Sequence, residues 1–65
     1  MRICVNGTWR EVGAPLLDRI LAELGYQEAV VATAVNGQFV GANERAKMAL
    51  NEGDKVEIVA PMQGG

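Results

Sequence analysis

The 65-residue chain contains no histidine, no serine and a single cysteine, Cys4. The missing histidine and serine exclude Ser-His and Cys-His catalytic pairs and make a zinc site unexpected. A single cysteine cannot form a disulfide within the chain, which agrees with a reducing, cytoplasmic location. We therefore expect a protein that is not itself an enzyme and that binds no metal.

The chain is also weakly charged and poor in aromatic residues. Six Lys and Arg residues against eight Asp and Glu residues give a formal net charge of −2, whereas nucleic-acid binding needs clustered basic residues. No apolar run approaches the ~20 residues that span a bilayer. We expect neither nucleic acid nor a membrane as a partner, and one domain over residues 1–65 that is too small to enclose a cofactor beside its core.

Alternating apolar and polar residues in the first part of the chain predict a β-hairpin. Residues 1–5 alternate, an Asn-Gly pair at positions 6–7 is typical of a type I′ turn, and residues 8–12 form the returning strand. A two-residue turn places Trp9 beside Cys4 on one face of the hairpin. A three-residue bulged turn would reverse the faces.

The next segment has the pattern of one amphipathic helix. Residues 13–15 read Gly-Ala-Pro, and Pro15 suits the first turn of a helix. Gly25 is typical of a left-handed cap at the end. The apolar stripe follows i, i+3, i+4, i+7 spacing, and in so small a domain we expect it to form the core; its members are Leu17, Ile20, Leu21 and Leu24.

The second half of the chain predicts three more strands. An apolar run at residues 30–35, a second Asn-Gly turn and a short strand at 38–40 indicate another hairpin. A helical turn is expected within residues 44–50, and residues 55–60 form the last strand. We therefore predict an α+β, β-grasp fold, with a mixed sheet of four to five strands and one main helix on one face. The first and last strands should lie side by side and parallel in the middle.

One helix can cover only one face of such a sheet. The opposite face is then expected to present Cys4, Trp9 and Val59. Because an apolar patch on the open face of a small sheet usually marks a partner site, we expect these residues to form a partner surface.

The last strand leads into a distinctive C-terminal segment. Pro61 has no N–H to donate, so the ladder should stop there and residues 61–65 should form a flexible tail. Gly64 and Gly65 carry no side chains, and the chain ends in a carboxylate. We interpret the Gly65 carboxylate as the functional group; the alternative is an inert chain end, since such ends are commonly small and disordered.

The chain resembles the ThiS family, the ubiquitin-like sulfur carriers of thiamin biosynthesis, over nearly its whole length. The residues that carry the resemblance are Met1-Arg2-Ile3-Cys4-Val5-Asn6-Gly7, Val31-Ala32-Thr33-Ala34-Val35-Asn36-Gly37, Gly53-Asp54-Lys55-Val56-Glu57-Ile58-Val59 and Gln63-Gly64-Gly65. The chain has Val40-Gly41-Ala42 and Arg45 where the family usually has Val-Pro-Arg followed by an aromatic residue.

This resemblance implies a mechanism in which the protein is a carrier and a substrate. An E1-like adenylating enzyme of the ThiF type would use ATP and magnesium to activate the Gly65 carboxylate. A cysteine-derived sulfur donor would convert it to a thiocarboxylate, and a thiazole synthase of the ThiG type would take the sulfur for the thiazole of thiamin. The resemblance further implies that Met62, Gln63 and Gly64 are recognised as part of the tail, and that no cofactor is bound.

Three other interpretations stay open at this point. Two are related β-grasp proteins with the same tail chemistry, namely the small subunit of molybdopterin synthase and a ubiquitin-like protein modifier. The third is a β-grasp interaction module without any chemistry at its tail.

Overall fold

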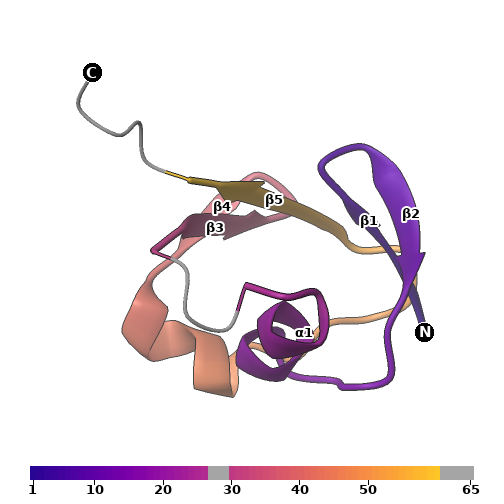
Figure 1. Cartoon of the computed structure of the whole chain (residues 1–65), viewed down its shortest axis with the longest axis horizontal. Helices are drawn as coiled ribbons and strands as arrows, with labels where there is room; N and C mark the ends of the chain where they lie inside the picture. Colours follow the sequence, from indigo (N-terminus) through magenta and orange to yellow (C-terminus); the bar gives the residue numbers. More distant parts are fainter. Residues whose placement is uncertain (27–29, 61–65) are drawn as a thin grey trace.

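A mixed sheet with one α-helix packed against one face makes up the described part of the chain (Figure 1). The computed structural model describes residues 1–26 and 30–60. The elements are β1 (Arg2–Val5), β2 (Thr8–Glu11), α1 (Leu17–Glu23), β3 (Ala32–Val35), β4 (Gln38–Val40), the 3-10 helix η1 (Ala42–Lys47) and β5 (Lys55–Val59).

The strand order confirms the predicted α+β, β-grasp arrangement. The five strands are arranged β2-β1-β5-β3-β4. The first and last strands, β1 and β5, are parallel neighbours, and the other pairs are antiparallel. As Figure 1 shows, α1 lies under one face of the sheet and η1 lies beside it.

Both hairpins have the tight turns that their Asn-Gly pairs predict. Asn6 and Asn36 each have φ of 50°, and the glycines that follow them each have φ of 85°. Positive φ at both turn positions is the type I′ conformation, which Asn and Gly adopt most readily. The resulting register pairs Cys4 with Trp9, so the two-residue alternative is confirmed and the bulged one is excluded.

The start of α1 corrects the prediction that a helix begins at residues 13–15. Helical geometry begins at Leu17, after an extended Leu16. The reason is a non-local pairing, because the amide of Leu17 donates to the Met48 carbonyl and the Pro15 carbonyl accepts from the Leu50 amide, each at 2.9 Å. These bonds hold Leu16 in an extended conformation and delay the start of the helix to Leu17.

The end of α1 agrees with the prediction. Gly25 has φ of 94°, a left-handed conformation that glycine adopts without a steric penalty. The amides of Gly25 and Tyr26 turn back to the carbonyls of Ala22 and Leu21, at 3.1 and 2.8 Å. These two bonds satisfy carbonyls that would otherwise be unpaired at the helix end.

Besides α1, two predicted elements differ by two or more residues at one end or both from those observed, whereas the other strands differ by at most one. The strand predicted over residues 30–35 begins at Ala32, and Val30 is 79% exposed. The helical turn predicted within residues 44–50 is η1, which spans Ala42–Lys47. It ends early because residues 48–50 are the partners of residues 15–17.

The core lies between the sheet and α1 and follows the predicted periodicities. Leu24 is half-buried at the end of the stripe, and Thr33 is a buried polar member of the core region. Among the described residues, the buried apolar side chains are Ile3, Val5, Val12, Leu17, Ile20, Leu21, Val35, Val40, Leu50, Val56 and Ile58.

Substitution of Leu21 tests the contribution of α1 to this core. Leu21 is 5% exposed, so Leu21→Ala should lower the free energy of unfolding by about 2–5 kcal/mol, a large part of the stability of a small domain. Arg19→Ala on the exposed side of the same helix is the control and should change it by less than ~0.5 kcal/mol. Thermal and urea unfolding measure both, and equal midpoints for the two variants would contradict the packing of α1.

Candidate functional site

The sheet face opposite α1 is exposed in the described part of the chain. Along β5 the buried Val56 and Ile58 alternate with exposed side chains, which therefore point away from the helix. Strand pairing extends this set to the neighbouring strands. We call the resulting surface the open face, and its residues are Cys4, Trp9, Ala32, Ala34, Phe39, Lys55, Glu57 and Val59.

Large apolar side chains are exposed on the open face. Trp9 is 50% exposed and Val59 is 61% exposed, so the structure places both where the sequence predicted, with Cys4 half-buried beside Trp9. Phe39 is 76% exposed and was missed by the sequence analysis. The signal was available, because a two-residue turn at residues 36–37 pairs Phe39 with Ala34 on the face opposite the buried Val40.

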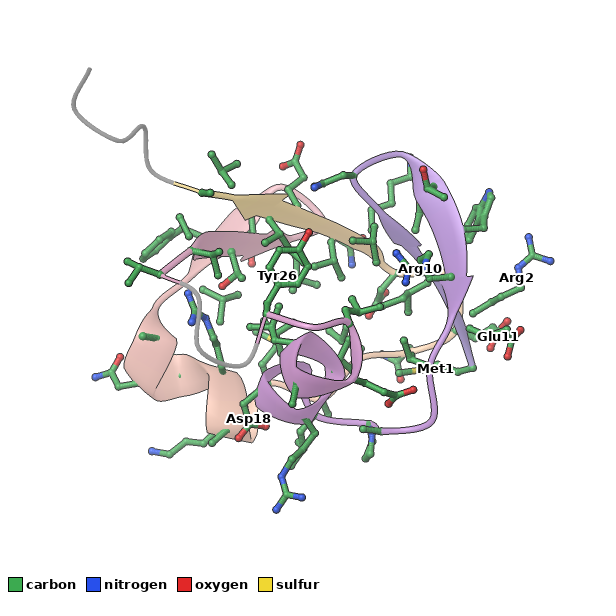
Figure 2. All side chains as sticks on the ribbon, in the orientation of Figure 1. Met1, Arg2, Arg10, Glu11, Asp18 and Tyr26 are labelled. Carbon is green, nitrogen blue, oxygen red and sulfur yellow. The ribbon has the colours of Figure 1, made fainter. Side chains whose placement is uncertain are left out.

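The apolar residues form two groups at opposite sides of the sheet. On the β1–β2 side, the guanidinium of Arg2 lies 5.0 Å from the centre of the Trp9 ring, a cation–π distance. Arg2 also pairs across the hairpin with Glu11, and both lie at the same end of it (Figure 2). On the β5–β3 side, a hollow of about 280 Å³ is lined by Val30, Val31, Ala32 and Val59.

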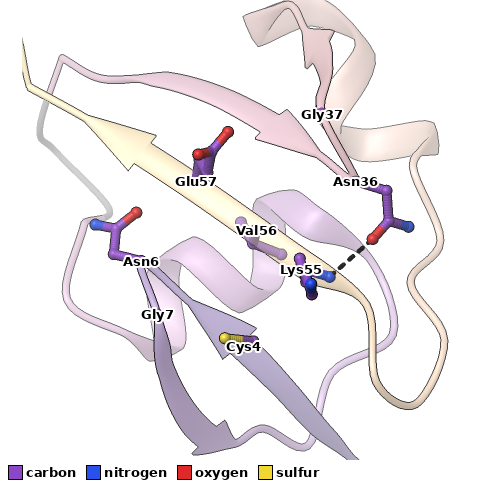
Figure 3. A pocket seen from close by; sticks show the side chains of 8 residues that line it. All are labelled: Cys4, Asn6, Gly7, Asn36, Gly37, Lys55, Val56 and Glu57. Atoms are coloured by element: carbon purple, nitrogen blue, oxygen red, sulfur yellow. Dashed lines mark hydrogen bonds between the residues drawn. The ribbon is translucent and has the colours of Figure 1, made fainter.

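A groove crosses the sheet between the two Asn-Gly turns. We call it the turn groove; its volume is about 630 Å³, and Figure 3 shows its lining residues. Lys55 and Glu57 provide one charge of each sign. The lining residues are Cys4, Asn6, Gly7, Asn36, Gly37, Lys55, Val56 and Glu57.

Asn6 extends the hydrogen-bond ladder between β1 and β5 beyond the end of β1. Its Oδ1 accepts from the Ile58 amide at 2.8 Å, and its Nδ2 donates to the Ile58 carbonyl at 3.0 Å. Its backbone amide donates to the Val56 carbonyl at 2.9 Å. The side chain thus takes the place of a backbone peptide where β1 turns away from β5.

Asn36 contacts the other end of β5 in a related way. Its Oδ1 accepts from the Lys55 amide at 3.0 Å (Figure 3), and its Nδ2 donates to the Asp54 carboxylate at 3.1 Å. The backbone amide of Asn36 donates to the Lys55 carbonyl at 2.7 Å. The two turns therefore fix β5 from opposite sides of the sheet.

Arg45 connects η1 to β3 inside the domain. Its Nε donates to Thr33 Oγ1 at 3.0 Å and its Nη2 donates to the Val31 carbonyl at 2.6 Å. The Thr33 hydroxyl in turn donates to the Val40 carbonyl at 2.7 Å. Because these bonds engage the Arg45 guanidinium, this residue positions η1 against the sheet.

The predicted tail residues lie outside the described residues, namely Met62, Gln63, Gly64 and Gly65. Within residues 1–26 and 30–60, no three His, Cys, Asp or Glu side chains come together as a metal site. Among the helices that the structure describes, none has the length and apolar character needed to cross a membrane.

Comparisons with known proteins agree with this architecture. The model of the ThiS family matches residues 3–65. The sulfur carrier protein ThiS of Thermus thermophilus is 35% identical over 63 residues, which cover 97% of this chain and 98% of that protein. A thiazole synthase of Paramagnetospirillum magneticum is 38% identical over 66 residues. These cover 100% of this chain and only 20% of that longer protein.

Two solved structures from Geobacter metallireducens are similar in fold. The crystal structure of its thiamine biosynthesis protein (ThiS) superposes with a TM-score of 0.84 at 29% identity, covering the whole of both chains. The NMR solution structure of a thiamine biosynthesis protein gives 0.78 at 25% identity, covering all of this chain and 88% of that one.

The fold and the family match thus define a small β-grasp protein of the sulfur-carrier class. The chain belongs to the ThiS family, the sulfur carrier proteins of thiamin biosynthesis.

Replacement of Asn6 tests its contribution to the β1–β5 pairing. Asn6→Gly keeps the positive φ but removes two hydrogen bonds to Ile58, and it should lower the free energy of unfolding by roughly 1–3 kcal/mol. Amide exchange at Ile58 should accelerate because its side-chain partner is lost. The matched variant Asn36→Gly should cost less, since its partners are exposed. Urea unfolding and hydrogen exchange measure these effects, and an unchanged Ile58 exchange rate would refute the role of Asn6.

Proposed function

We propose that this protein carries sulfur on the carboxyl group of Gly65. The observation that supports the proposal most is that the match to the ThiS family runs from residue 3 to residue 65 and so includes the Gly-Gly end. In the proposed cycle an E1-like adenylating enzyme of the ThiF type activates Gly65. Sulfur from a cysteine-derived donor then converts it to a thiocarboxylate, and a thiazole synthase of the ThiG type receives the sulfur.

The chemistry of a carboxylate explains why activation is needed. A carboxylate is a poor electrophile, because its negative charge repels a nucleophile and oxide is a poor leaving group. A Gly65 oxygen attacks the α-phosphate of ATP and releases pyrophosphate, and the sulfur nucleophile then displaces AMP from the acyl group. ATP and magnesium belong to the adenylating enzyme in this proposal, and the carrier contributes the acyl group alone.

The position of β5 suits it to present such a group. β5 is the central strand, paired with β1 on one side and with β3 on the other. The side-chain amide of Asn6 also forms two hydrogen bonds with the backbone of Ile58 in β5. A segment that follows this strand therefore starts from one of the best-anchored positions in the domain, which reduces the entropy lost when the partner binds it.

The relative from Paramagnetospirillum magneticum supports a thiazole synthase as a partner. In that protein a region similar to this whole chain is part of a much longer thiazole synthase. A carrier-like region and a synthase that share one polypeptide can work together without separate encounter. By analogy, we assign the same pairing to this chain and a separate synthase.

The open face is the surface that we assign to partner binding. Trp9, Val59 and Phe39 expose large apolar side chains there, with Cys4 half-buried beside Trp9. Apolar and aromatic groups of this kind are typical anchors of protein interfaces. Lys55 and Glu57 add one positive and one negative charge to this face, which can orient a bound partner.

Removal of Gly65 separates folding from chemistry. The variant without Gly65 should unfold like the unchanged protein, because every core residue that the structure describes precedes Ala60. It should bind the adenylating enzyme but fail to release pyrophosphate from ATP. Its carboxylate ends one residue short, up to about 3.5 Å from the required position, and misplacement by 1 Å can cost on the order of 100-fold in rate.

Gly64→Val tests the width of the path that the tail follows, at unchanged tail length. It adds bulk without shortening the chain, and it should also fold, bind and fail in adenylation if the tail enters a narrow channel. Each variant is incubated with the adenylating enzyme, ATP, magnesium and sulfide. Pyrophosphate release then measures adenylation, and intact mass measures conversion to the thiocarboxylate. Normal pyrophosphate release by the protein without Gly65 would refute Gly65 as the reactive group.

Trp9→Ala tests the open face as the partner surface. Loss of an aromatic anchor should weaken binding to the adenylating enzyme or the synthase by ~2 kcal/mol or more. The free energy of unfolding should change less, by about 0.5–1 kcal/mol, the value of its exposed contact with Arg2. Thr8→Ala lies on the same strand but the opposite face and should leave binding unchanged. Titration calorimetry measures affinity, and equal affinities for Trp9→Ala and the unchanged protein would exclude this surface.

A further inference from the structure

The two hairpin turns provide a natural comparison of one reactive sequence in two environments. Both turns read Val-Asn-Gly, at residues 5–7 and 35–37, with the same backbone conformation. Glycine after asparagine favours deamidation, because no side chain hinders the attack of its backbone nitrogen on the asparagine amide. We propose that Asn36 is a site of spontaneous deamidation in the folded protein, whereas Asn6 is protected by its contacts with β5.

The proposed modification needs water and no other reactant. The backbone nitrogen of Gly37 attacks Cγ of Asn36 and loses its proton, a C–N bond forms, and Nδ2 leaves as ammonia. Water then opens the five-membered succinimide. Attack at the side-chain carbonyl gives aspartate, and attack at the main-chain carbonyl gives isoaspartate. No atom is oxidised or reduced.

Protection at Asn6 follows from its two hydrogen bonds. For Cγ to reach the nitrogen of Gly7, the amide must leave both the N–H and the C=O of Ile58. Ile58 is 6% exposed, and these bonds are partly buried, so water replaces them poorly. Release of Asn6 therefore leaves the part-buried N–H and C=O of Ile58 without their side-chain partners, which raises the free energy needed to free the amide.

Asn36 lacks this protection. Its Nδ2 is bonded to the carboxylate of Asp54, and its Oδ1 accepts from the Lys55 amide, and both bonds are exposed. Water can replace either partner at little cost. The backbone bond from Asn36 to the Lys55 carbonyl is not one of the two that the side chain must leave, so its release does not require β3 and β5 to separate.

The products would change one end of the turn groove. A carboxylate at position 36 faces the carboxylate of Asp54 where the amide donated a hydrogen bond, so attraction becomes repulsion. Isoaspartate also lengthens the main chain of the turn by one methylene group. This shifts β4 relative to β3, and with it the buried Val40 and its bond from Thr33.

Deamidation of the purified full chain in mildly alkaline buffer tests the proposal. Ion exchange separates the more acidic product, peptide mapping by mass spectrometry locates it, and an isoaspartyl methyltransferase assay quantifies isoaspartate. We expect Asn36 to convert at least about tenfold faster than Asn6, a factor equal to about 1.4 kcal/mol of opening free energy. Equal rates at the two sites, or a faster Asn6, would overturn the proposal.

The same measurement in urea provides the control for local sequence. Once the chain is unfolded, the two Val-Asn-Gly sites should convert at similar rates, because their neighbours match. A preference for Asn36 that persists in urea would show that sequence, not structure, sets it, and would also overturn the proposal. In folded Asn36→Gly, which keeps the positive φ, the acidic product should disappear; an undiminished product would place the reaction elsewhere.

Discussion

The hydrogen bonds that hold β5 between β1 and β3 are the constraint on which the rest of the molecule depends. β1 and β5 are parallel and share only a short register, Cys4 with Lys55 and Val5 with Val56. Short parallel pairs are weak by themselves. The side chain of Asn6 extends this pairing to Ile58, and Asn36 adds bonds to Lys55 on the other side. The strand that precedes residues 61–65 is thereby fixed along its length.

Each turn asparagine satisfies two requirements at once. The turn needs positive φ, which glycine or asparagine can adopt. The neighbouring strand needs a donor and an acceptor, which glycine lacks and the asparagine amide supplies. Glycine at Asn6 would keep the hairpin but leave Ile58 without its side-chain partners. The same choice places an asparagine amide before a glycine in both turns, and the burial of its hydrogen bonds differs between them.

Local patterns in the sequence were sufficient for much of the fold and for part of the open face. Alternation and the Asn-Gly turns predicted the hairpin register that pairs Cys4 with Trp9, and Gly25 marked the helix end. They predicted exposure of Trp9 and Val59 as well, although the role of these residues in binding stays a prediction. Each of these features depends on residues that are close in sequence.

The errors and omissions depend on contacts between distant residues. Pro15 suits the first turn of a helix, but residues 15–17 pair with residues 48–50, and no local pattern encodes that pairing. The bonds from Arg45 to Thr33 and Val31 also join residues that are distant in sequence, so no local pattern predicts them. Phe39 was different, since the turn register was sufficient to place it.

The alternation along β5 separates the residues that stabilise the domain from those available to partners. Val56 and Ile58 are buried against the helix side, and Glu57 and Val59 face outward. A second helix over the open face would bury more apolar surface but would remove that surface from partners. With a single helix, the domain keeps one apolar face in water, at a cost in stability that its small core must offset. Outward substitutions can therefore change the proposed partner surface while the core that anchors β5 stays unchanged.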